Sequence, residues 1–139
     1  MKVFSGRRVL LILPDLAGGG AERTSINLLE YLDPIQFEVD LALLEARGEY
    51  FNTHGKGRHI ITAQGWLSRL ALRFSADSIS RGIIHIFVLR GLIAQHKPDI
   101  VMSSMADVSL PCAFAWILLP NLRKHVRWIA REGNHTDVV

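Results

Sequence analysis

Short apolar runs and longer amphipathic stretches take turns along the chain. Residues 9–13 are five aliphatic side chains in a row, a run that is too short for a buried helix and typical of a parallel strand covered on both faces. Residues 37–44 alternate apolar side chains with Glu38 and Asp40, which predicts a strand with two unequal faces. Three further strands are expected at residues 59–61, 100–102 and 126–130.

Helical spacing fills the intervals between these strands. The first helix is expected directly after Gly20, and its inner face carries Ala21, Ser25, Leu28, Leu29 and Leu32. Further helices are expected at residues 66–74, 80–96 and 110–119, and a polar loop at residues 48–58. This alternation predicts one α/β domain over residues 1–139, with a Rossmann-like, doubly wound parallel sheet.

Glycine and polar residues follow the expected strands. In doubly wound sheets, ligands bind beyond the carboxyl ends of the strands. We therefore expect these residues on one rim of the sheet, where a ligand would lie. They are Gly18 to Gly20, Glu45, Ser103, Ser104 and residues 131–134.

The run Gly18, Gly19 and Gly20 is the most informative local feature. Glycine adopts positive φ and lets a ligand approach the backbone closely. The free N–H groups at the start of the following helix, together with the helix dipole, favour an anion. The sequence therefore indicates an anion-binding loop, and a tight turn without a ligand is the alternative.

The same residues resemble a known family. Ile12-Leu13-Pro14-Asp15-Leu16 followed by Gly18-Gly19-Gly20-Ala21-Glu22-Arg23 is similar to the first strand and loop of family 4 glycosyltransferases, which have the GT-B fold. Residues 37–39, 97–101 and 131–134 continue the resemblance in order. The resemblance implies the amino-terminal, acceptor-side half of a GT-B fold. The carboxy-terminal donor-binding domain is expected to be absent, because the sequence stops at Val139 without its paired-glutamate motif.

The resemblance also implies a function and a set of site residues. The function is transfer of a sugar, with retention, from a nucleoside-diphosphate sugar to a lipid-linked or envelope glycan. Gly18, Gly19 and Gly20 would contact the donor diphosphate. The residues implied to orient this loop or contact the acceptor are Glu22, Arg23, Ser103, Ser104, Arg131, Glu132 and Asn134.

No metal and no cofactor are implied, because the family neutralises the diphosphate with protein donors. The catalytic residue stays unassigned. Many family members carry a histidine soon after the fourth strand, where this chain has Ser103 and Ser104. Without its donor-binding half, the chain is expected to be inactive alone.

Composition narrows the setting of the domain. The chain is 49% hydrophobic, which excludes disorder. Its net charge of +3 and pI near 9.4 suit a phosphate-bearing substrate or an anionic membrane surface, and the excess is too small to indicate nucleic acid. Cys112 is the single cysteine, so no disulfide framework exists and a reducing, cytoplasmic compartment is expected.

Residues 66–74 raise the possibility of peripheral membrane contact. They combine Trp66 and Phe74 with Arg69 and Arg73, a mixture that favours a membrane interface. A helix that packs on the sheet with its arginines in water explains the same residues. No apolar run reaches the roughly 20 residues of a spanning helix.

Two other classes of function remain open. A dinucleotide-binding half of an oxidoreductase would use Gly18 and Gly20 as the start of G-x-G-x-x-G, with Glu45 on the ribose. Arg23 occupies the third glycine position of that motif, where close helix packing is needed. The other alternative is a non-catalytic remnant that acts as an interaction module. The six histidines show no metal-ligand spacing, and His85 is expected on a helix surface.

Overall fold

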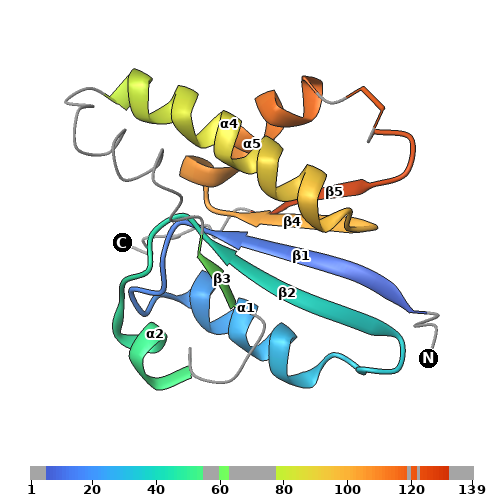
Figure 1. The fold of residues 1–139 in the computed structure, drawn as a ribbon. Coiled ribbons are helices and arrows are strands. Elements are labelled where there is room, and N and C mark those ends of the chain that lie inside the picture. Colours follow the sequence, from blue (N-terminus) through green and yellow to red (C-terminus); the bar gives the residue numbers. More distant parts are fainter. Residues whose placement is uncertain (1–5, 55–59, 63–77, 119, 122, 132–139) are drawn as a thin grey trace, which may run out of the picture.

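The computed structural model describes residues 6–54, 60–62, 78–118, 120–121 and 123–131. Five strands form one sheet: β1 (Arg7–Leu13), β2 (Phe37–Leu43), β3 (Ile60–Thr62), β4 (Ile100–Ser104) and β5 (Arg127–Arg131). All neighbouring strands are parallel, in the order β3-β2-β1-β4-β5 (Figure 1). The described helices are α1 (Gly20–Tyr31), α2 (Glu49–His54), α4 (Ser78–His96) and α5 (Ala106–Ile117). The predicted doubly wound parallel sheet is confirmed.

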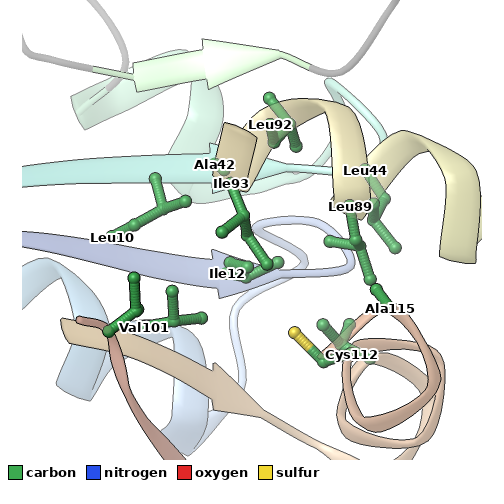
Figure 2. Close-up of a cluster of buried hydrophobic side chains, with 12 residues drawn as sticks. Leu10, Ile12, Ala42, Leu44, Leu89, Leu92, Ile93, Val101, Cys112 and Ala115 are labelled. Atoms are coloured by element: carbon green, nitrogen blue, oxygen red, sulfur yellow. The ribbon is translucent and has the colours of Figure 1, made fainter. Parts of the chain in front are cut away.

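The helices form two layers, with α1 and α2 on one side of the sheet and α4 and α5 on the other (Figure 1). β1 lies between β2 and β4, and its aliphatic run is covered on both faces. Leu10 and Ile12 pack toward α4 and α5, beside Leu89, Ile93 and Cys112 (Figure 2). The alternate residues of β1 pack into a second cluster with α1. The uninterrupted apolar run of β1 is thus explained by a core on each side.

The direction in which strands are added reverses at β1. The chain places β2 and β3 on one side of β1, and β4 and β5 on the other side. Open α/β sheets bind ligands at such a switch point, beyond the carboxyl ends of the two strands that flank it. Residues 14–17 lead from the end of β1 to the three glycines, so the fold puts the glycine loop near this position.

Two predicted elements need correction. The polar loop expected at residues 48–58 contains helix α2, because Tyr50 and Phe51 pack into the core cluster beneath α1. Helix α5 begins at Ala106 instead of residue 110, since the N–H groups of Val108 and Ser109 already bond to the carbonyl of Met105. The helix expected at residues 66–74 lies outside the described residues. Within the described part of the chain, no helix is both long and apolar enough to cross a membrane.

Candidate functional site

The carboxyl rim is the edge of the sheet where β1, β2, β4 and β5 end. Gly18 follows β1 and Glu45 follows β2, whereas Ser104 is the last residue of β4 and Arg131 the last residue of β5. Because all these strands are parallel, the residues lie along one edge, as the sequence predicted. Glu132 and Asn134 lie outside the described residues.

The three glycines of the loop have three different conformations. Gly18 has a φ of +115° and Gly19 is the extended N-cap of α1, whereas Gly20 is the first helical residue. The expectation of positive φ is therefore correct for Gly18 and wrong for Gly19 and Gly20. A Cβ at Gly20 would meet no atom within 4 Å. The N-cap of α1 is a glycine, so no N-cap side chain accepts a hydrogen bond from the first N–H groups of the helix. The loop is also exposed. Free N–H groups at an exposed helix start favour the binding of an anion.

Glu22 lies against this loop. It is buried in the first turn of α1, and its Oε2 would lie 2.6 Å from a Cβ on Gly19. Glycine at position 19 therefore leaves room for the Glu22 carboxylate, because a Cβ there would clash with it. The negative charge of Glu22 complements the positive end of the helix dipole. Arg23, by contrast, does not lie against the glycine loop. It is exposed and lines a hollow with Tyr50, between α1 and α2.

An ion-pair cluster that sequence reasoning missed joins the loops after β1 and β2. Arg47 Nε donates to Asp15 Oδ2 at 2.7 Å and lies 3.0 Å from Glu45 Oε2. The Asp15 carboxylate is nearly buried and also accepts from the N–H of Ala17 at 3.0 Å. Glu45, on which the dinucleotide alternative depends, is thus paired with an arginine. Hydrogen bonding to Asp15, followed by the negative charges of Glu45 and Asp15, raises the pKa of Arg47.

Backbone contacts tie the same two loops together. The N–H of Leu16 donates to the carbonyl of Arg47, and the N–H of Tyr50 donates to the carbonyl of Leu16. Gly48 between them has a φ of +115°, and a Cβ there would overlap the Leu16 carbonyl. The loop that leads into the three glycines is therefore held by the second loop and by α2. No local sequence motif predicts this contact between the two loops. The one sequence feature that points to it is the glycine at position 48.

The two serines at the end of β4 have a mainly structural environment. Ser103 is fully buried, accepts a hydrogen bond from Trp128 Nε1 at 3.0 Å and shares another with Ser109 Oγ at 3.0 Å. These bonds join β4 to β5 and to α5. Ser104 is also buried, at 2% exposure. Ser103 thus holds the rim together, and neither serine is open to solvent.

Arg131 ends β5 beside the start of α5. Its carbonyl accepts from the N–H of Met105, the N-cap of α5, which has a φ of +80°. Among the described residues, its Nη1 is the one buried side-chain nitrogen or oxygen that has no hydrogen-bond partner. An unpaired guanidinium nitrogen in that setting is stabilised by an acidic group. Arg131 therefore keeps its place as a candidate contact for an anionic substrate.

His85 and Cys112 have environments that limit their chemistry. His85 of α4 is half-buried, contrary to the expected surface position. Burial lowers its pKa, the negative charges of Glu45 and Asp107 oppose that change, and Arg81 adds to it. Burial raises the pKa of Cys112 to about 12, so its thiol stays protonated at neutral pH. No cluster of histidine, cysteine and carboxylate side chains suited to a metal occurs among the residues that the structure describes.

Comparisons with known proteins identify the fold. No protein-family model and no curated protein matches the sequence. Among solved structures, one similar chain is described as a UDP-N-acetylglucosamine 2-epimerase from Listeria monocytogenes, with a TM-score of 0.60 and 14% identity over 91% of this chain and 30% of that chain. Another is the lipopolysaccharide outer core galactosyltransferase WaaB, with a TM-score of 0.51 and 18% identity over 90% of this chain and 33% of that chain. This chain thus spans about a third of each neighbour. It has the α/β, Rossmann-like fold that these GT-B proteins share.

Proposed function

We propose that this chain is the acceptor-side half of a glycosyltransferase that moves a sugar from a nucleoside-diphosphate sugar to a glycan acceptor. The observation that carries this proposal is the glycine loop at the start of α1. It lies at the switch point of the sheet, with exposed glycines and an N-cap that has no side chain. The GT-B fold of the neighbours is consistent with it.

In this proposal the residues of the carboxyl rim have different roles. The N–H groups at Gly19 and Gly20 stabilise the charge that develops on the donor diphosphate as it leaves. Glu22 lies against Gly19, and the guanidinium of Arg131, whose buried Nη1 has no hydrogen-bond partner, lends its positive charge to an anionic group of the substrate. Ser103 positions β5 and α5 around the site. The resemblance to family 4 enzymes implies no resident metal or cofactor.

The finer points of the proposal rest on the resemblance of the sequence to family 4 enzymes. They are retention of anomeric configuration, contributions from Glu132 and Asn134, and a lipid-linked or envelope acceptor. The proposed place of action is the cytoplasmic face of the membrane. Sedimentation with anionic vesicles at low salt and release at high salt would support that location, because surface charges are screened within about 8 Å at physiological ionic strength.

Sugar transfer by the complete product of the gene tests the proposal. Gly20→Val should abolish most of the activity while leaving the fold intact, because a side chain there meets no protein atom and lies where the donor would approach. Glu45→Gln is the matched control and should retain activity, since Glu45 pairs with Arg47.

Two outcomes would contradict this assignment. A larger loss in Glu45→Gln than in Gly20→Val, together with tight binding of NAD, would favour the dinucleotide alternative. Sugar transfer by the 139 residues alone would contradict the assignment of this chain to the acceptor side.

A further inference from the structure

A polar hollow lies between α1 and α2, on the side of the sheet away from α4 and α5 (Figure 1). Its volume is about 390 Å³, and its described lining consists of Arg23, Ile26, Asn27 and Glu30 of α1 and Tyr50 of α2. Residues 23, 27 and 30 are four and three positions apart, so they share one face of the helix, and all three are exposed. Ile26 is 5% exposed and belongs to the core. The hollow therefore has polar walls over an apolar floor.

Tyr50 joins this hollow to the glycine loop. Its N–H donates to the carbonyl of Leu16 at 3.2 Å, and its side chain packs against the core cluster beneath α1. Its Cε2 would lie 3.8 Å from a Cβ on Gly18. The hollow follows α1 from Arg23 to Glu30, which is about 10 Å at 1.5 Å per residue. One side of the hollow is therefore close to the glycine loop, and the fold holds the aromatic side chain there in place.

The polar side chains of the hollow match the hydroxyl groups of a sugar. The Arg23 guanidinium only donates hydrogen bonds, the Glu30 carboxylate only accepts them, and the Asn27 amide does both. A hydroxyl group also donates and accepts, so one sugar ring can bond to all three. The ring of Tyr50 adds an apolar surface for the C–H groups of the sugar. The lining carries one charge of each sign, so a neutral sugar fits it better than a phosphate, which the Glu30 carboxylate repels.

We propose that this hollow binds a neutral sugar unit of the acceptor, next to the unit that receives the transferred sugar beside the glycine loop. The volume is in the range of small-molecule sites. The acceptor is then an oligosaccharide of at least two sugar units, so the reaction lengthens a glycan that an earlier sugar transfer has started. The inference rests on the proposed function and adds to it a binding subsite and the length of the acceptor.

Titration of the chain with four neutral disaccharides, followed by NMR, tests the hollow directly. The probes are maltose, cellobiose, lactose and N,N′-diacetylchitobiose. With at least one of them, the backbone amides of Arg23, Asn27 and Tyr50 should shift, together with the side-chain amide of Asn27. That disaccharide should bind more tightly than its monosaccharides, because its second unit reaches the glycine loop. Its affinity should be the same at low and at high salt, because salt screens only charged ligands.

Two polar residues of α1 offer a matched pair of variants. Asn27 lines the hollow, whereas Thr24 does not, and the Thr24 hydroxyl donates to the carbonyl of Gly20 at 2.8 Å. Asn27→Ala should weaken binding of the disaccharide about fivefold, which is the usual net effect of one hydrogen bond. Thr24→Ala should change the affinity less than about twofold, because its side chain does not face the ligand. Melting curves of both variants confirm that the fold is kept.

Several results would overturn the proposal. If none of the four disaccharides shifts these amides, or if the two variants lose the same affinity, the polar residues of the hollow are a solvated helix surface. Shifts at Arg23 and Asn27 with inorganic phosphate, reduced by salt, would assign the hollow to an anion. Equal affinity for a disaccharide and its monosaccharides would contradict the inferred length of the acceptor. None of these measurements uses a nucleotide-sugar, so the subsite can fail while sugar transfer stands, or the reverse.

Discussion

Replacing Gly48 by alanine is the sharpest test of how the glycine loop is held. Gly48 has a φ of +115°, which side chains rarely tolerate, and its Cβ would overlap the carbonyl of Leu16. The strain of such a backbone conformation is about 1–3 kcal/mol. The overlap must also move Leu16, whose N–H and carbonyl bond to Arg47 and Tyr50. The variant therefore disrupts the contact between the loops after β1 and β2 and does not perturb the sheet.

The magnitude follows from these parts. Two disturbed hydrogen bonds cost about 1 kcal/mol each, in addition to about 2 kcal/mol of backbone strain. Alanine stabilises the folded protein by about 0.7 kcal/mol through the lower entropy of the unfolded chain. We expect Gly48→Ala to lower the free energy of unfolding by about 3 kcal/mol, which corresponds to a melting temperature lower by about 10 °C for a domain of this size.

Urea unfolding followed by circular dichroism measures this change, with Gly20→Ala as the control. Gly20 is helical and its Cβ would meet nothing within 4 Å, so alanine there should be neutral or stabilising by up to about 1 kcal/mol. Amide exchange at Leu16 and Tyr50 should accelerate in Gly48→Ala only. The reasoning is refuted if the two variants unfold at the same urea concentration.

Three further predictions concern buried polar groups. Ser103→Ala should lower the free energy of unfolding, measured in urea, by about 1–2 kcal/mol, because it leaves Trp128 Nε1 without its hydrogen-bond partner. Ser109→Ala keeps that bond and should lower the free energy of unfolding less. An equal loss of stability in the two variants would contradict this prediction. Because the pKa of His85 is lowered from 6.5 on folding, the unfolded chain takes up its proton first as the pH falls. Stability should therefore decrease from about pH 6.5 down to the folded pKa, and less so in His85→Gln; identical pH profiles would argue against it. Cys112, with a pKa of about 12, should resist a thiol reagent at pH 8 in the native protein and react once urea unfolds it; rapid native labelling would show that the site is open.

The sequence alone determined the class of fold and the place of the glycine loop. The aliphatic run of β1 and the helical spacing after Gly20 are local periodicities, and they predict the two elements. The buried side of α1 was predicted only in part, because Glu22 and Ile26 are buried together with Ser25 and lie outside the predicted face. Once the strands are taken as parallel, their carboxyl ends must share one edge. The rim positions of Gly18, Glu45, Ser104 and Arg131 follow from that without any knowledge of contacts.

Partners across the fold were decided by the tertiary structure. Asp15 and Arg47 are 32 residues apart, and Ser103 and Trp128 are 25 residues apart. Nothing in the local pattern of either segment selects the other. The conformation of Gly20 was also decided by the tertiary structure, because a run of three glycines does not show which of them begins the helix.

An apolar groove between α4 and α5 is also a product of the tertiary fold. The sequence predicts helices at residues 80–96 and 110–119, and the structure leaves the apolar side chains of Ile83 and Phe114 in these helices exposed. Hydrophobicity along a sequence predicts that a side chain avoids water, but not which surface it turns to. That depends on how two helices, joined through β4, pack side by side on the same sheet.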